Sequence, residues 1–560
     1  MLPLRVAVTG RASLGSAGRR TARSALAALV AAAASAGCAH RGKPVVLDRP
    51  AGIIVEQRRA GPAWRFDEVA VRSEDESFGG GRRRGSAPAL RSFSEAVAAF
   101  DFDEALKFAV VRRLRGDPAG GEAEQRLIEA LRLAVAGSDA ADSALAETIR
   151  ASDDTLVRRV ARLALTATLQ YHGQWATLAE LPPVEGRGAD SAAAYAASGA
   201  ATSRARSGTS GTSGGGAAVT TTRPAIARLA DTTVTSMAGV TPFAAGDSGR
   251  TGYVSAVMDD PAAKASVESW ARAYRGAPGA RYVFPNRPVV LPLSLSPTGA
   301  PVVPVMVNGR QFLFWLDTGS SLTILSSEVA ATAGAAAYGA DTLEIVTATG
   351  RVAARPAVVS SLALGGVVVR DLPAMIVEGD ALSLPSRDGT TPARVDGIVG
   401  FDVIRRMDLE LNYAASRATI REPAAPDPRH PTPRNLFWLG YPVVRLVASD
   451  GRPVHFALDT GADETYAALP LIWKTRVRTV AAERRRVSGF GNTLTVRGQV
   501  IPQLRLMLRE TALRFERVFV YVVDYPTLFT LDGTLGGDVG AGGVVRIDMT
   551  NGVFAVGGER

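Results

Sequence analysis

Apolar residues in the first third of the chain recur at helical intervals. The first such series comprises Phe100, Leu106, Val110 and Leu114, and Asp117-Pro118 ends this predicted helical segment. Further stretches with the same spacing lie at 123–135, 142–149 and 155–171. We therefore expect an Ala/Leu-rich helical domain over residues 91–182.

The pattern changes at Pro288 to short Val-rich runs separated by turn residues. Val302–Val307 and Phe312–Leu316 flank Asn308-Gly309, and Asn-Gly between apolar runs is a strong β-hairpin signal. The chain from residue 288 onward is therefore predicted to be mostly β. One helix is expected near 262–274, inside an otherwise ambiguous connector.

Two of the predicted strands end in the same tripeptide. Asp317-Thr318-Gly319 follows Phe312–Leu316, and Asp459-Thr460-Gly461 follows Val454–Leu458. A carboxylate at the end of an apolar strand is costly to bury unless it is paired, so two such sites in one chain suggest that they pair with each other. Two close carboxylates cannot both ionise, so one keeps a proton while the other acts as a base.

The surroundings of the tripeptide are repeated as well. An Asp-Gly pair lies 79 residues after the first Asp, at Asp396-Gly397, and 73 residues after the second, at Asp532-Gly533. Each pair is followed by an apolar segment that contains glycine. Repetition on this scale indicates a duplicated structural unit rather than two unrelated turns.

These motifs resemble those of the retropepsin-like and pepsin-like aspartic proteases. The second copy is similar to the retroviral form and the first, with Ser320 after the glycine, to the pepsin form. The resemblance covers residues 288–421 and 435–558, and it implies a bilobal fold of two retropepsin-like β-barrel lobes with one active site between them. Phe401 and Gly537 stand where the retroviral enzymes have Arg, and Thr534 replaces an apolar residue, so the subsite loops are expected to differ.

The resemblance assigns roles to individual residues. Asp317 and Asp459 would hold one catalytic water, and no metal or other cofactor is required. The supporting residues would be two threonines that cross-link the lobes, two glycines whose amides reach the carboxylates, and a serine that donates to Asp317: Thr318, Thr460, Gly319, Gly461 and Ser320. A flap over the substrate would use Thr349 and Gly350 in the first copy and Gly489, Phe490 and Gly491 in the second, although an ordinary hairpin turn fits these residues too.

Composition narrows the possible functions. The 560 residues carry a net charge of +10, almost all of the basic residues being Arg, and 46% of the residues are hydrophobic. No basic stripe with interleaved aromatic residues is present, so nucleic acid is not expected as a partner. The four histidines have no metal-ligand spacing, and the single cysteine excludes a zinc cluster built on thiolates.

That cysteine lies at an informative position. Arg19, Arg20 and Arg23 precede the apolar run Ala25–Ala36, and Ser35-Ala36-Gly37 leads into Cys38. This order is typical of a secretory signal, and the last residues resemble a bacterial lipoprotein cleavage site. We expect export to the periplasmic or cell-surface side with Cys38 lipidated and anchored to a membrane; a plain signal peptide with an incidental cysteine is the alternative.

The sequence thus predicts a multidomain protein with an N-terminal α-helical region that resembles a tetratricopeptide array, followed by the two lobes. The expected segments are a signal peptide (1–37), a disordered tether (38–90), helices (91–182), a low-complexity linker (183–225), a connector (226–287), lobe 1 (288–421), a Pro-rich connector (422–434) and lobe 2 (435–558).

The leading hypothesis is an aspartic endopeptidase that acts on peptide or protein substrates as a monomer. Two alternatives remain open. The chain could be a catalytically inactive peptide-binding lipoprotein that keeps a protease-like fold, or each lobe could pair with its twin in a second chain.

Overall fold

The computed structural model describes residues 56–57, 90, 92–181, 268–347, 349–384, 393–426, 433–438, 440–475, 477–490, 492–521, 529–541 and 543–557. The predicted signal peptide, Cys38, the low-complexity linker, most of the tether and of the 226–287 connector, and residues 427–432 of the Pro-rich connector lie outside these ranges. Within the tether, β1 (Glu56–Gln57) pairs antiparallel with β22 (Thr511–Tyr521).

The helical region consists of six helices, four of which have a side-chain cap at the N-terminus. They are α2 (Phe93–Ala98), α3 (Phe102–Leu114), α4 (Pro118–Val135), α5 (Ala141–Arg150), α6 (Thr155–His172) and α7 (Trp175–Glu180). Ser92, Asp101, Asp117 and Asp154 accept hydrogen bonds from the first turns of α2, α3, α4 and α6, which satisfies amides that have no partner inside the helix. Pro118 begins α4, because a proline at the first helical position lacks only an amide that the helix cannot use.

One prediction for this region was wrong. Phe100 does not begin a helical stripe with Val110 and Leu114; it lies between α2 and α3 with φ of 60°. The residues of α3 that are buried are Ala105 and Ala109, whereas Leu114 is 82% exposed. The small alanines allow α3 to pack closely on α4, so that face is the buried one. The resemblance to a tetratricopeptide array stays a prediction.

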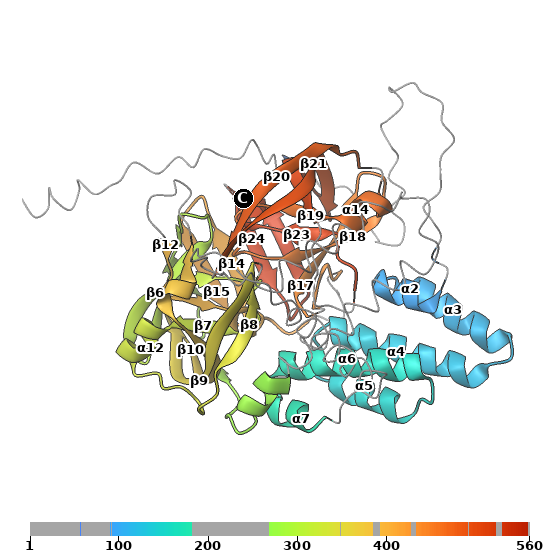
Figure 1. Cartoon of the computed structure of the whole chain (residues 1–560), viewed down its shortest axis with the longest axis horizontal. Helices are drawn as coiled ribbons and strands as arrows, with labels where there is room; N and C mark the ends of the chain where they lie inside the picture. Colours follow the sequence, from blue (N-terminus) through green and yellow to red (C-terminus); the bar gives the residue numbers. More distant parts are fainter. Residues whose placement is uncertain are drawn as a thin grey trace, which may run out of the picture. The chain divides into compact units, whose positions relative to one another are not determined.

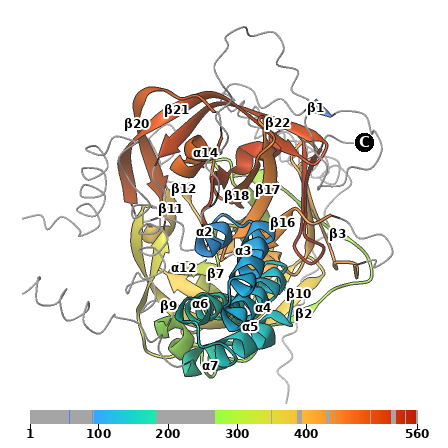
Figure 2. The same ribbon diagram turned by 90° about the vertical axis from the view of Figure 1, so that its right-hand side faces the viewer.

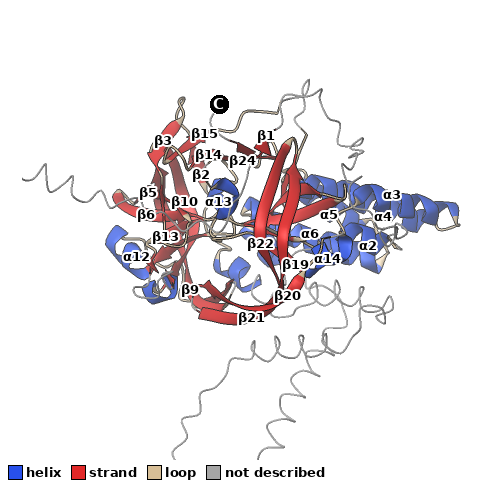
Figure 3. Cartoon of the chain, turned by 90° about the horizontal axis from the view of Figure 1, so that it is seen from above, coloured by secondary structure: helices blue, strands red, loops and turns tan. Residues whose placement is uncertain are grey.

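Residues 281–557 are mainly β-strands, as Figure 3 shows by colour. We call residues 289–421 the first lobe and 436–557 the second lobe. The first contains β3 (Val289–Pro292), β4 (Ser294–Leu295), β5 (Pro301–Val307), β6 (Arg310–Leu316), β7 (Thr323–Ser326), α12 (Ser327–Ala333), β8 (Leu343–Thr347), β9 (Gly350–Leu364), β10 (Val367–Val377), η2 (Gly379–Leu382), β11 (Ser383–Leu384), β12 (Ala393–Arg394), β13 (Gly397–Val399), α13 (Phe401–Ile404), β14 (Asp408–Asn412) and β15 (Arg417–Arg421). A further strand, β2 (Arg281–Val283), pairs with β10, and a short helix covers residues 268–273.

The second lobe repeats this order. It contains β16 (Leu436–Trp438), β17 (Pro442–Ala448), β18 (Pro453–Leu458), β19 (Tyr466–Ala468), α14 (Leu469–Lys474), β20 (Val480–Gly489), β21 (Asn492–Leu508), β22, β23 (Gly533–Leu535), η3 (Gly537–Gly540), β24 (Val544–Asp548) and β25 (Val553–Gly557). In the first lobe β10, β7, β13, β6, β5 and β9 pair in that order, and β9 pairs back onto β10. The same closed arrangement in the second lobe uses β22, β19, β23, β18, β17 and β21.

The predicted Asn-Gly hairpin is confirmed. Asn308 and Gly309 have φ of 47° and 84°, and they join β5 to β6 with Val307 opposite Arg310. Positive φ at both turn residues is the conformation that Asn and Gly tolerate at low energy. The turn sets the register that carries Asp317 to the end of β6.

A five-stranded sheet joins the lobes, in the order β25-β24-β14-β15-β3. Its central pair is β14 of the first lobe and β24 of the second, with Glu410 opposite Arg546. Arg546 also donates two hydrogen bonds to Asp408, at 2.7 and 3.1 Å, and Asp408 is buried. Two parallel N–H···O bonds of this kind fix both the orientation and the distance of the partners.

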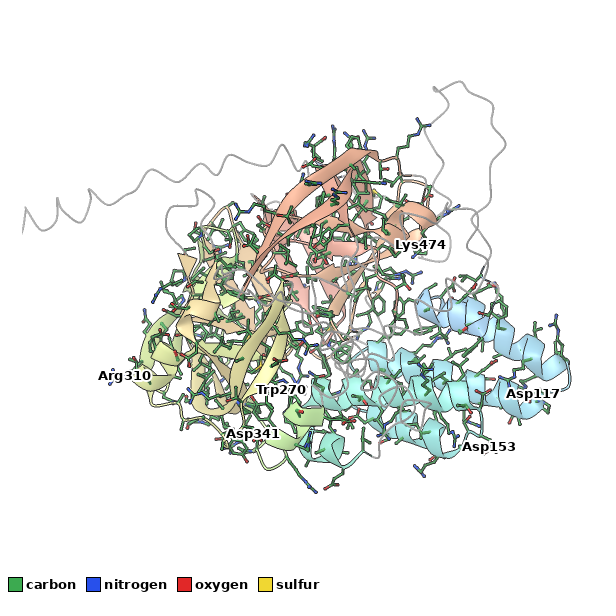
Figure 4. The ribbon with its side chains drawn as sticks, viewed as in Figure 1. Asp117, Asp153, Trp270, Arg310, Asp341 and Lys474 are labelled. Carbon is green, nitrogen blue, oxygen red and sulfur yellow. The ribbon has the colours of Figure 1, made fainter. Side chains whose placement is uncertain are left out.

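The helical region contacts both lobes. The ring of Phe100 lies 5.2 Å from Phe437, 4.8 Å from His455 and 5.3 Å from Phe529, and Thr530 N donates to Ala98 O at 2.8 Å. In the first lobe, the guanidinium of Arg405 lies 4.2 Å from the ring centre of Tyr171 in α6. The separate helix at 268–273 also contacts this lobe, since the indole of Trp270 (labelled in Figure 4) donates to Glu344 O at 3.1 Å. No helix in the described part of the chain is long and apolar enough to cross a membrane.

Candidate active site

Asp317 and Asp459 meet where β6 and β18 end. A Cβ added to Gly319 would lie 2.6 Å from the carboxyl carbon of Asp459, and one added to Gly461 would lie 2.6 Å from that of Asp317. Each glycine therefore allows the carboxyl group of the opposite lobe to approach the backbone, which any larger residue would prevent. The sequence prediction that the two motifs come together agrees with this arrangement.

Backbone amides hold each carboxyl group. Gly319 N donates to Asp317 Oδ1 at 2.8 Å, while Asp459 Oδ1 accepts from Gly461 N at 2.9 Å and from Ala462 N at 3.0 Å. These bonds favour the ionised form of each carboxyl group. The Ser320 hydroxyl, which we expected to donate to Asp317, donates to Leu322 O at 2.8 Å instead. That side chain therefore supports the loop after Gly319 rather than the carboxyl group.

The two threonines bind each other's strand in a reciprocal pattern. Thr318 Oγ1 donates to Leu458 O and Thr460 Oγ1 donates to Leu316 O, both at 2.7 Å. Each hydroxyl also accepts the backbone amide of the other threonine at 3.0 Å. Because both side chains are buried, these four bonds lock the ends of β6 and β18 together beneath the carboxyl groups.

Burial and mutual charge set the ionisation of the pair. Burial, and then the charge of Asp459, raise the pKa of Asp317 well above its usual range, and burial also raises the pKa of Asp459. The two groups share a hydrogen bond that raises the pKa of Asp317 and lowers that of Asp459. Such a pair retains one proton over a range of pH, and the two carboxyl groups titrate as a unit.

The loops after each motif are held by a Thr–Asp contact that the sequence reasoning missed. Thr323 donates to Asp402 through both its amide (3.1 Å) and its hydroxyl (3.0 Å), and Thr465 Oγ1 donates to Asp538 Oδ1 at 2.7 Å. The signal was present, since each Thr stands six residues after its motif Asp and each Asp six residues after the Asp of Asp-Gly.

The Asp-Gly pairs also have a structural function. Asp396 Oδ2 accepts the amide of Leu313 at 2.9 Å, and Asp532 Oδ2 accepts that of His455 at 2.8 Å, so each binds the strand that carries a motif Asp. Asp532 is buried and also accepts from Lys474 of α14 (Figure 4) at 3.0 Å. Asp396 and Asp532 therefore help to hold β6 and β18 in position.

The tips of two long hairpins meet. One hairpin is β8–β9 and the other β20–β21, the two seen in Figure 1; Figure 2 shows β20 and β21 again beside β22. Thr347 Oγ1 donates to Phe490 O at 3.1 Å, and a Cβ on Gly489 would lie 2.7 Å from Thr349 Oγ1. The predicted flap residues Thr349, Gly350, Gly489 and Phe490 are thus at these tips, whereas Gly491 lies outside the described residues.

The ring of Phe490 lies 5.7 Å from that of Trp315, two residues before Asp317. The tip of the second hairpin therefore covers the strand that carries the first carboxyl group. In the described part of the chain, no group of three or more His, Cys, Asp or Glu side chains could hold a metal ion.

Comparison with known proteins supports an aspartic protease-type function. A family model described as aspartyl protease matches residues 303–403, a stretch that includes Asp317 and the first hairpin. The crystal structure of a retropepsin-like aspartic protease from Rickettsia conorii is 14% identical over 25% of this chain and 92% of that chain, with a TM-score of 0.17. No curated protein matches the sequence.

The reciprocal threonine bonds give a first testable prediction. Thr460→Val keeps the shape of the side chain but leaves the Leu316 carbonyl and the Thr318 amide unpaired, at roughly 1–3 kcal/mol for each buried group. We expect the free energy of unfolding from urea titration to fall by about 2 kcal/mol or more. Thr166→Val is the control, because that hydroxyl bonds only a carbonyl of its own helix, Arg162 O. Equal losses in the two variants would contradict the cross-link.

A second prediction concerns stability and pH. Burial raises the pKa of Asp538 to about 7 and that of Asp402 to about 6. A carboxyl whose pKa is higher in the folded state stabilises the protein most below the unfolded pKa of 3.8, and this contribution is lost as pH rises through about 7. When the pH is raised from 4 to 8, we expect the Tm of Asp538→Asn to fall by less than the Tm of the wild type.

The control is Asp341→Asn, which alters an exposed carboxylate. It should leave the pH dependence of Tm as in the wild type. An Asp538→Asn protein whose Tm falls as steeply as that of the wild type would show that Asp538 ionises normally.

Proposed function

We propose that the chain is an aspartic endopeptidase with one active site formed by Asp317 and Asp459. The observation that carries the proposal is the buried carboxyl pair, held by backbone amides above the reciprocal threonine bonds. A pair that shares one proton has both an acid and a base available at the same place. That is the requirement for adding water to a peptide bond without a metal or a covalent intermediate.

The roles of the two carboxyl groups follow from their surroundings. Ionised Asp459 accepts a proton from a water held between the pair, and protonated Asp317 donates to the oxygen of the scissile carbonyl. In the resulting tetrahedral intermediate, Asp459 passes the proton it took from water to the leaving amine, the C–N bond breaks, and Asp317 regains a proton from the hydroxyl group that becomes the new carbonyl oxygen. The higher pKa of Asp317 supports this assignment of the acid.

The hairpin tips would close over an extended peptide. Strand edges in β8–β9 and β20–β21 offer backbone hydrogen bonds to a substrate in the β conformation. The contact between Thr347 and Phe490 joins the tips, so a substrate would have to separate them on entry. Exclusion of water by the closed tips would strengthen the electrostatic effects within the site.

We propose further that a monomer contains the whole active site. We also propose that the protein is exported from the cytoplasm and anchored to a membrane by a lipid on Cys38. The cross-lobe bonds of Thr318 and Thr460 within one chain support the monomer. The basic segment, apolar run and Cys38 support the anchor. Light scattering of the protein without residues 1–38 tests the first proposal, and metabolic labelling with a radioactive fatty acid tests the second.

A third prediction tests catalysis. Asp317→Asn and Asp459→Asn each remove one member of the pair and should each lower kcat/KM at least about a thousandfold in a peptide-library digestion. The control Asp341→Asn removes an exposed carboxylate of the first lobe and should cleave like the wild type. Cleavage at near wild-type rate by either single variant of the pair would rule out a shared site.

A fourth prediction concerns the pH profile. Activity needs one protonated and one ionised carboxyl group, so kcat/KM should follow a bell-shaped curve. The alkaline limb marks the loss of the proton on Asp317, whose raised pKa extends activity from acidic toward mildly acidic pH. Full activity at strongly alkaline pH would show that no retained proton is needed.

A further inference from the structure

The two lobes carry different side chains at matched positions beside the carboxyl pair. Trp315 stands two residues before Asp317, and Ala457 stands two residues before Asp459. The remaining matched pairs, first lobe and then second, are Ile324 and Tyr466, Ile398 and Thr534, Val377 and Tyr521, and Ala300 and Tyr441.

Strand register establishes that these positions correspond. In the first lobe Ile398 pairs with Trp315 on one side and with Ile324 on the other. In the second lobe Thr534 pairs with Ala457 and Tyr466 in the same way. Val377 pairs with Ser326 and Tyr521 with Ala468, each two residues beyond the matched position of its neighbour strand. Residues paired across adjacent strands share a face of the sheet, so each lobe presents one wall.

These walls lie on the side of the sheet that bears the catalytic groups. Side chains two residues apart on a strand point to the same face, which puts Trp315 on the side of Asp317. The ring of Phe490, at a hairpin tip, contacts Trp315 on that face. The two walls therefore face the space between the carboxyl pair and the hairpin tips.

The wall of the first lobe is apolar throughout. Trp315, Ile324 and Ile398 are 4%, 5% and 1% exposed and belong to one hydrophobic cluster that includes Phe490. A polar side chain placed against this wall would lose its hydrogen bonds to water without replacement. Lifting the hairpin tip would free the wall for an aliphatic or aromatic side chain.

The wall of the second lobe is rich in hydroxyl groups. The rings of Tyr466 and Tyr521 lie 5.1 Å apart and their side chains are hydrogen-bonded, while Thr534 adds a hydroxyl in the next strand. Tyr441 lies close to the pair, since the charges of Asp459 and Asp317, after burial, help to raise its pKa to about 12. A phenol both donates and accepts, so this wall can bind a side chain that does the same.

We infer that the two walls select different residues on the two sides of the scissile bond: an apolar side chain against the first lobe, and a hydrogen-bonding polar side chain against Tyr466, Tyr521 and Thr534 of the second. The inference rests on the proposed function. A polar side chain against the second wall can make additional hydrogen bonds to these hydroxyl groups, whereas an apolar one displaces water from them and replaces none of its hydrogen bonds, which is a source of discrimination.

The experiment uses peptides of one sequence in which only the two residues flanking the scissile bond change. Written in the order before and after the scissile bond, the four versions carry Leu-Gln, Gln-Leu, Leu-Leu and Gln-Gln. Wild type is compared with Tyr466→Phe/Tyr521→Phe, which removes two hydroxyl groups, and with Tyr466→Ile/Thr534→Ile, which gives the second wall the residues of the first. Tyr338→Phe, a tyrosine of the first lobe at none of the matched positions, is the control.

We expect the wild type to prefer one mixed peptide over the two-Leu peptide by about tenfold in kcat/KM. The Phe variant should lose that preference, and the Ile variant should reverse it toward two Leu, while the control behaves like the wild type. A wild type that prefers two Leu, or a preference that survives both double variants, would overturn the inference while leaving proteolysis in place.

Binding separates this inference from the proposed reaction. The same four peptides with a reduced, non-cleavable bond are titrated into the wild type by calorimetry. Selective binding of a mixed peptide by a protein that cleaves none of them would support the two walls and overturn proteolysis. Failure to bind or cleave any of the four would overturn both.

Discussion

Two carboxyl groups buried side by side cannot both be ionised, and the geometry around Asp317 and Asp459 makes that constraint unavoidable. Asp317 is 8% exposed, and each carboxyl group lies against the glycine of the opposite motif. Amides stabilise negative charge on each oxygen that they contact, yet the two charges oppose each other. One shared proton resolves the conflict, and the acid–base chemistry that we propose depends on that proton.

The rest of the fold maintains this close approach. Thr318 and Thr460 fix the strand ends, while β14 and β24 with the Arg546–Asp408 pair join the lobes in the five-stranded sheet. Asp396, Asp532 and the Thr–Asp contacts support the strands and loops from the side. Because these contacts involve residues about 70 to 140 positions apart, the site requires both lobes to be folded and joined.

Much of this could be predicted from the sequence, and the exceptions have physical reasons. Duplicated motifs after apolar strands indicated the pairing of Asp317 with Asp459, and Asn308-Gly309 fixed a hairpin, because these signals are local or repeated. Ser320 was misassigned because hydroxyl orientation depends on the turn at Leu322, which spacing does not specify. Phe100 left its expected helix because its ring packs among aromatic residues of the second lobe, a tertiary contact without a local signal.

Duplication also leaves room for the halves to diverge. The tripeptides, the Thr–Asp contacts and the strand order are common to both lobes, whereas the walls beside the carboxyl groups differ at every matched position. A single chain allows this, because each lobe can change without altering the other. The shared part holds the proton, and the divergent part is available for selection of the substrate.

The most direct test of the account is a difference proton titration of the wild type against Asp317→Asn/Asp459→Asn. The account predicts that, of the two additional protons that the wild type can bind, one is released only well above the ordinary pKa of an aspartate. Release of two additional protons near pH 4, as from independent carboxylates, would contradict it.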